Sequence, residues 1–115
     1  MSVLKIEEST NLEARCKDLL NDPKIRFVGV INSLGNLIAG GFKKGIRPFE
    51  NREKCQMLYM QMVLEISMRR EFDQSLGKVN YTVSSRDKAL MISIPANKHV
   101  ILISEIGRAS CRERV

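Results

Sequence analysis

The alternation of apolar and polar positions along the chain predicts two helices and five strands. Apolar residues that recur every three or four positions mark the helices, and apolar residues that alternate with polar ones or run continuously mark the strands. In chain order the expected elements are helix 10–20, strands 25–32 and 37–42, helix 50–72, and strands 78–84, 89–94 and 99–104. This order, α-β-β-α-β-β-β, predicts an α+β fold.

Local signals mark several boundaries of these elements. Thr10 and Glu13 form a capping-box pattern that predicts the start of the first helix at Thr10. Residues 33–36 contain Gly-Asn and are expected to close a hairpin between the first two strands. Gly40 and Gly41 weaken the second strand and indicate a bulge or a close approach of another backbone.

The burial pattern of the strands predicts their order in the sheet. The first and fifth strands are apolar at both sets of alternate positions, which is typical of central strands covered on both faces. Short connections pair the first strand with the second, and the third with the fourth and the fifth. The expected five-stranded antiparallel sheet therefore has the order 2-1-5-4-3, with the two helices on opposite faces.

The long helix carries two apolar stripes on nearly opposite sides. The first stripe comprises Cys55, Leu58, Tyr59, Met62 and Ile66. The second, which we call the methionine stripe, comprises Met57, Met60, Leu64 and Met68. One sheet can bury only one stripe, and an exposed apolar patch of this kind usually marks an interaction surface. The pattern therefore favours a dimer, although a segment after the fifth strand could cover the methionine stripe instead.

The third strand offers an independent indication of dimerisation. Val79, Tyr81 and Val83 alternate with polar residues, and the predicted order places this strand at an edge of the sheet. The unpaired backbone groups of an edge strand are a template for pairing with a symmetry mate. We expect a homodimer that uses both the long helix and this strand.

The chain resembles the roadblock/dynein light chain family, within the wider longin and profilin-like group, over about residues 10–104. The hairpin RFVGVINSLGNLIAGG (residues 26–41) and the long helix after it carry this resemblance. Three further segments resemble an archaeal group of small proteins without an assigned function: DPKIRFVGVIN, the helix end MRREFD, and LGKVNYTVSSRDKALMISIP. The family normally continues with a helix after the fifth strand, and this C-terminal helix is missing here.

The resemblance implies a non-catalytic scaffold that homo- or heterodimerises, and many members of the family bind or regulate small Ras-like GTPases. The positions that match the family's dimer interface are Met57, Met60, Leu64, Met68, Val79, Tyr81 and Val83. Two other functions stay open. One is a small-molecule-sensing profilin-like module, and the other is a basic nucleic-acid binder.

Length and charge bear on the domain organisation. The chain has 115 residues, a length that suits one domain. Its net charge is +6. The string from Glu105 to Val115 resembles a translated short-read sequencing adapter, so we expect one domain over residues 1–104 and a disordered non-native tail over 105–115. A genuine basic tail is the alternative. Without residues 106–115, 16 basic and 12 acidic residues remain, a net charge of +4.

Other chemistry receives little support from the sequence. No apolar run is long enough to span a membrane and the N-terminus has no secretory pattern, so a cytoplasmic protein is expected. The chain has three cysteines that lie far apart in the sequence, Cys16, Cys55 and Cys111, and a single histidine, His99. This set indicates neither a zinc site nor an activated nucleophile. We expect no enzyme activity, cofactor or metal.

One basic segment remains as a candidate site. Lys43, Lys44 and Arg47 lie in the loop before the long helix, where they could bind an acidic partner or remain solvated. Arg69 and Arg70 suit the C-terminal end of that helix. Aromatic residues make up only 5% of the chain, which leaves few platforms for stacking on single-stranded nucleic acid and argues against that partner.

Overall fold

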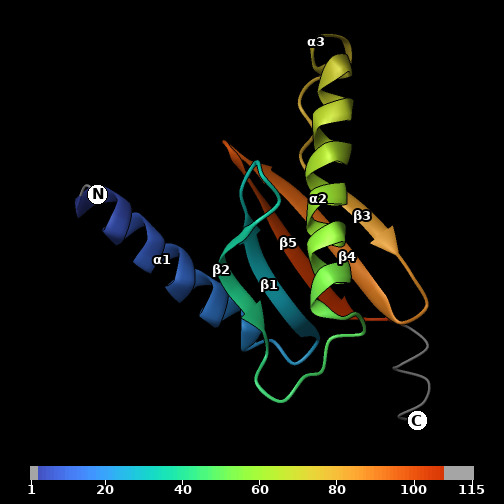
Figure 1. The fold of residues 1–115 in the computed structure, drawn as a ribbon. Helices are drawn as coiled ribbons and strands as arrows, with labels where there is room; N and C mark the ends of the chain where they lie inside the picture. Colours follow the sequence, from blue (N-terminus) through green and yellow to red (C-terminus); the bar gives the residue numbers. More distant parts are fainter. Residues whose placement is uncertain (1–2, 108–115) are drawn as a thin grey trace.

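The computed structural model describes residues 3–107, with side chains from residue 11 onward, as an antiparallel sheet that has helices on both faces (Figure 1). The elements are α1 (Val3–Leu20), β1 (Ile25–Ile31), β2 (Leu37–Phe42), α2 (Arg52–Arg69), the 3-10 turn η1 (Arg70–Phe72), α3 (Asp73–Leu76), β3 (Thr82–Ser85), β4 (Ala89–Ala96) and β5 (His99–Ile106). The strand order β2-β1-β5-β4-β3 and the α+β class confirm the predictions.

Two apolar layers hold the helices to the sheet. The layer beneath α2 comprises Phe27, Ile31, Tyr59, Met62, Val63, Ile66, Met91, Val100 and Leu102. The layer beneath α1 comprises Cys16, Ile25, Val28, Val30 and Ala39, with Leu12, Leu20, Ile101 and Ile103 partly buried around it. Every residue of β1 is buried, as expected for a central strand covered on both faces.

The first helix begins earlier than predicted. It starts at Val3, so Thr10 lies inside α1 and the expected start at Thr10 is wrong. The residues upstream include Leu, Lys and Glu, which favour helix and let it extend past the capping-box pattern. Glu13 instead reaches the sheet, where its Oε2 accepts a hydrogen bond of 2.8 Å from the backbone N–H of Gly40.

The long helix begins at a side-chain cap. Asn51 is the N-cap residue, and its Oδ1 accepts a hydrogen bond of 2.9 Å from the N–H of Lys54. This cap moves the start two residues past the predicted one at residue 50. The helix also ends earlier than the predicted residue 72: α2 stops at Arg69 and η1 takes up the last three predicted positions. The short helix α3 follows beyond the predicted end and closes at Gly77, with φ of +85°.

Of the glycine pair in β2, Gly40 marks a close approach of two backbones, which is one of the two features that the sequence indicated here. Gly40 has a φ of +83°, and a Cβ at this position would collide with the carbonyl oxygen of Val28 in β1. The register between β1 and β2 shifts nearby, between Val30 and Ile31. Glycine is therefore required at position 40 both by the backbone conformation and by the neighbouring strand.

The last three strands differ from their predicted bounds. β3 begins only at Thr82, because residues 78–81 still lead in from the end of α2 and α3, which project past the sheet (Figure 1). β5 continues past Ser104, where the apolar alternation was expected to end: Glu105 pairs with Ile25 and Leu90. Backbone pairing tolerates this change of side-chain pattern. Residues 108–115, where the rest of the predicted tail falls, lie outside the described residues.

Candidate functional site

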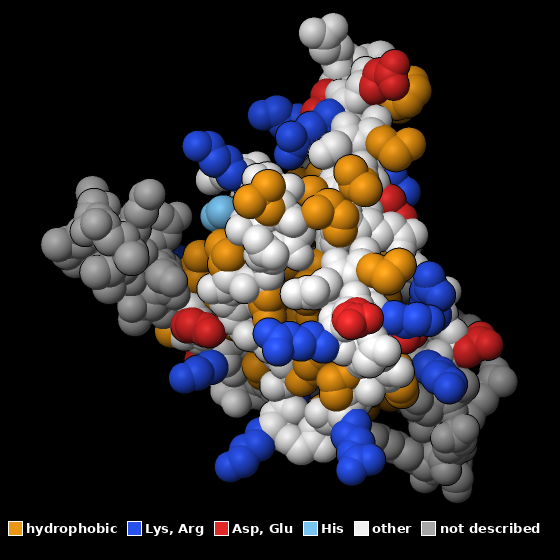
Figure 2. Space-filling view, in the orientation of Figure 1, with side chains coloured by type: hydrophobic (Ala, Val, Ile, Leu, Met, Phe, Trp, Pro, Cys, Tyr) orange, Lys and Arg blue, Asp and Glu red, His pale blue; other side chains and the backbone are white. Residues whose placement is uncertain are grey.

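The methionine stripe lies on the side of α2 that faces away from the sheet. Met57 and Met68 are 68% and 73% exposed, Leu64 is 54% exposed, and Met60 is 38% exposed. Met60 is the most covered of the four because Gly35 of the β1–β2 hairpin lies next to it. Figure 2 shows hydrophobic side chains along this outer side of α2. The predicted division of the helix into a buried stripe and an exposed stripe is therefore present in the described residues.

Specific contacts fix which side of α2 faces outward. The hydroxyl of Ser93 in β4 donates to Sδ of Met62 at 3.2 Å, and the rings of Phe27 and Tyr59 stack with centroids 5.9 Å apart. Toward the end of the helix, Nη1 of Arg69 donates to Oγ1 of Thr82 at 2.8 Å. These contacts hold the opposite side of α2 on β1, β3 and β4, and leave the methionine stripe outward.

The third strand contributes a second exposed element. β3 pairs with β4 and ends the sheet in the described part of the chain. Tyr81 is 64% exposed, Val83 is 48% exposed, and Val79 is half-buried. Val83 lies opposite Ile92 in the ladder, on the face of the sheet away from α2. The seven residues predicted for the interface therefore do not form one continuous patch.

The face of the sheet away from α2 is only partly covered in the described residues. The contacts of α1 with the sheet are concentrated on β1 and β2. On the same face, the apolar side chains of β4 are half-buried: Leu90, Ile92 and Ile94. Together with Val83 they form a second apolar surface across β3 and β4.

One of the three cations in the basic loop before α2 already has a hydrogen-bond partner within the fold. Nζ of Lys43 donates to the backbone carbonyl of Asp22 at 2.6 Å, which holds this cation against the α1–β1 connection. The side chains of Lys44 and Arg47 are exposed. The backbone carbonyl of Arg47 accepts a hydrogen bond of 3.2 Å from Nη2 of Arg26. Two of the three predicted cations thus remain available to an acidic partner.

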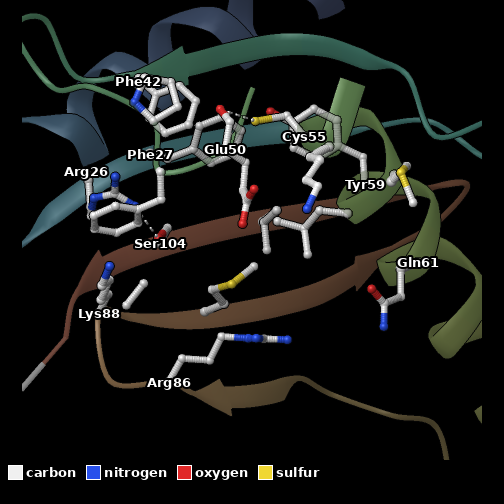
Figure 3. Close-up of a pocket in the computed structure, with 18 of the residues that line it drawn as sticks. Arg26, Phe27, Phe42, Glu50, Cys55, Tyr59, Gln61, Arg86, Lys88 and Ser104 are labelled. Carbon is white, nitrogen blue, oxygen red and sulfur yellow. Dashed lines mark hydrogen bonds between the residues drawn. The ribbon is translucent and has the colours of Figure 1, made fainter. Parts of the chain in front are cut away.

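A hollow of about 590 Å³, here called the α2 hollow, lies between the first half of α2, the loop before it and the sheet (Figure 3). Arg26 in β1 points into it and is only 7% exposed. Sequence analysis missed this residue. Its signal in the sequence is an arginine inside the otherwise apolar strand IRFVGVI, where a charge is costly unless it is hydrogen-bonded or paired.

The two cysteines of the described chain have the properties of packed thiols. Burial raises the pKa of the Cys16 thiol, and the nearby Glu13 carboxylate raises it further. Burial and then Glu50 raise the pKa of Cys55 in the same direction. Because the thiolate is the reactive form, both shifts lower the reactivity of these groups at neutral pH.

The ring nitrogen Nδ1 of His99 is buried without a hydrogen-bond partner in the described residues.

Two further kinds of site are absent from the part of the chain that the structure describes. Among the side chains of residues 11–107, no group of three or more His, Cys, Asp or Glu lies close enough together to hold a metal ion. Within the same span, no helix combines the length and the hydropathy needed to cross a membrane.

Solved structures with the same arrangement are roadblock/LC7 domains. A roadblock/LC7 domain from Streptomyces avermitilis superimposes with a TM-score of 0.62 at 11% identity, over 84% of this chain and 79% of that one. The gliding protein MglB from Thermus thermophilus gives a TM-score of 0.65 at 10% identity, over 92% and 83%. MglB from Myxococcus xanthus gives 0.63 at 16% identity, over 94% and 81%. The protein has a roadblock/LC7 fold.

Sequence comparison assigns the chain to one family within this class of fold. No match was found among curated proteins. Residues 1–111 match the family of unknown function DUF6659, and the chain belongs to that family.

Proposed function

We propose that this protein is a non-catalytic, homodimeric scaffold that regulates a small Ras-like GTPase. The observation that carries the proposal is the exposed methionine stripe on α2. Four large apolar side chains on one side of a surface helix exceed the scattered exposure expected of a monomer. The roadblock/LC7 fold supports the scaffold role, and the GTPase partner rests on the resemblance to the roadblock family.

The edge of β3 supports a particular geometry for the dimer. Its outer backbone groups have no partner strand within the described residues, so two copies could join their sheets through β3. Val83 lies on the sheet face away from α2, so the strand would contribute backbone hydrogen bonds rather than extend the methionine stripe. An interface with a two-fold axis would combine α2 of each copy with β3 of each copy.

Light scattering tests the dimer directly. We expect the protein to have twice its chain mass at micromolar concentration, and the double variant Met60→Glu/Met68→Glu to be a folded monomer by circular dichroism. Leu19→Glu is the matched control, because Leu19 is an exposed apolar residue of α1, the helix on the other face of the sheet. A monomeric parent protein would refute the homodimer. Loss of the folded state in the double variant would identify the methionine stripe as part of the core.

Partner binding is a separate experiment. We expect a small Ras-like GTPase encoded by the same genome to co-elute with this protein in one nucleotide state, GDP or a non-hydrolysable GTP analogue. The Leu19→Glu control should retain this complex. If such GTPases fail to bind in either nucleotide state, the regulatory part of the proposal is wrong even where the dimer is present.

The α2 hollow favours a second candidate function, a small-molecule-sensing module. Its volume, its apolar wall and its buried arginine are features of a ligand site. A nucleic-acid function has less support, because Lys43 is held by a backbone carbonyl and only two exposed cations of the basic loop remain, Lys44 and Arg47.

A further inference from the structure

The α2 hollow has the size and lining of a small-molecule site. Its volume of about 590 Å³ lies inside the range of about 300–1,000 Å³ that such sites occupy. Its apolar wall belongs to the layer beneath α2, with side chains from both the helix and the sheet, and comprises Phe27, Phe42, Leu58, Tyr59, Met91 and Leu102. An apolar wall of this kind can receive the body of an organic ligand but provides no counter-charge.

A β-bulge directs Arg26 into the hollow. In the ladder between β1 and β5, Phe27 pairs with Ser104, and the register shifts between Ile25 and Phe27, so Arg26 is an extra residue. Strict alternation would place its side chain beside Val28, toward α1. The bulge turns it to the α2 side instead, where it lies next to Ser104 (Figure 3).

The guanidinium of Arg26 is buried without a carboxylate. Its Nη1 donates to Oγ of Ser104 at a long 3.4 Å, and its Nη2 donates to the carbonyl of Arg47 at 3.2 Å. Both acceptors are neutral, and three of its five N–H groups have no acceptor in the described part of the chain. Burial lowers the pKa of Arg26, yet a guanidinium stays charged at neutral pH. The group therefore lacks a counter-ion.

Other groups around the hollow favour an anion. The guanidinium carbon of Arg26 lies 4.1 Å from the centroid of the Phe49 ring, and Nζ of Lys88 lies 5.8 Å from the same centroid. The remaining charged side chains of the lining are Lys54 and Arg86, which are basic, and Glu50 and Asp87, which are acidic. Together with Arg26 and Lys88, the lining of the hollow carries four cations and two carboxylates.

We propose that the α2 hollow binds a small organic carboxylate, whose apolar body packs against Phe27, Tyr59 and Met91 and whose carboxylate pairs with Arg26. A carboxylate matches the planar fork of a guanidinium and would accept its unused N–H groups. The buried charge would then be paired, and the ligand would be held in one orientation by its head and its body. This site is separate from the partner surface of the proposed function, with which it shares only Met57.

The first experiment compares two probes of nearly the same size and shape, one with an anionic carboxylate and one with a neutral amide. The ligand 2-naphthoate and its neutral counterpart 2-naphthamide are titrated into the protein carrying ¹³C-labelled methionine methyl groups. We expect the acid to bind roughly tenfold more tightly than the amide, the difference that a charge-assisted pair supplies. The methyl signal of Met91 should shift, and those of Met60 and Met68 should not, because only Met91 of these three lines the hollow.

The second experiment removes the charge of the site. Arg26→Gln should weaken 2-naphthoate binding about tenfold and abolish the preference for the acid over the amide. Lys44→Gln is the control, since it removes an exposed cation of the nearby loop that does not line the hollow. It should leave both affinities unchanged.

These results decide the proposal even if Arg26→Gln does not fold. Equal affinities for the acid and the amide would overturn it in the parent protein, as would shifts confined to Met60 and Met68. The latter result would place the naphthyl group on the methionine stripe. Failure of dimerisation would leave the ligand proposal unaffected, because its readouts lie in the hollow of one chain.

Discussion

Glu13 of α1 and Gly40 of β2 are joined by a hydrogen bond of 2.8 Å, from the backbone N–H of Gly40 to the carboxylate of Glu13. This bond ties the first helix to the second strand at a point where no larger residue fits. Gly40 has positive φ and lies against the carbonyl oxygen of Val28, so the backbone at this position is constrained from both sides.

Gly40→Ala is expected to destabilise the protein strongly, with Gly45→Ala as its matched control. Both glycines have positive φ, +83° and +86°, but a Cβ at Gly45 meets open space. Gly45→Ala should therefore cost about 1–2 kcal/mol of backbone strain. Gly40→Ala should cost at least about 3 kcal/mol, because it adds a collision with Val28. Urea unfolding followed by circular dichroism measures both, and equal losses would contradict the close approach.

Tyr59 makes the stability depend on pH in the alkaline range. Burial, with a smaller contribution from Cys55, raises the pKa of Tyr59 to about 12. The unfolded chain has a pKa of about 10 at this side chain and so loses the proton first. Stability is therefore fully retained below about pH 10 and falls as pH rises toward 12.

The variant Tyr59→Phe removes this pH dependence. Between pH 10 and pH 12, the unfolding free energy of the variant should fall by on the order of 2 kcal/mol less than that of the parent protein. Chemical denaturation at a series of pH values measures the difference. Tyr81→Phe is the control at an exposed tyrosine, and its profile should follow the parent. Parallel profiles for all three proteins would disprove the role of Tyr59.

The two stripes of α2 should respond differently to the same substitution. Met62→Ala removes a buried side chain from the layer beneath α2 and is expected to cost about 2–4 kcal/mol. Met68→Ala removes a side chain that is 73% exposed and should change the unfolding free energy by less than about 0.5 kcal/mol. Thermal unfolding of dilute protein, where association contributes least, measures both. A large loss in Met68→Ala would show that its stripe is buried.

The start of α2 depends on the cap at Asn51. Asn51→Ala should destabilise the protein by about 1 kcal/mol, because the N–H of Lys54 loses its acceptor. Asn51→Ser, which keeps a capping oxygen, should recover most of this loss. Unfolding free energies of the three proteins test the assignment, and similar values for Ala and Ser would be evidence against the cap.

Much of the fold could be predicted because its signals are local. Strands 25–32 and 37–42 were predicted to within a residue from their apolar runs and the glycine-containing hairpin. The continuous burial of β1 then required a central position, which determined the sheet order. The two stripes of α2 follow from the helical period alone. The predicted ends of the elements were less accurate. The starts of α1 at Val3 and of β3 at Thr82 depend on the segments before them and not on a local sequence pattern.

The sequence by itself determined the sheet order and the two apolar stripes of α2, and it indicated an irregularity at the glycine pair of β2. Only the tertiary structure decided that Arg26 points into the α2 hollow and that Val83 lies on the sheet face away from α2. Both outcomes depend on the register between strands distant in sequence. A one-residue bulge moves a side chain from one face of a sheet to the other, and no local pattern in β1 reports it.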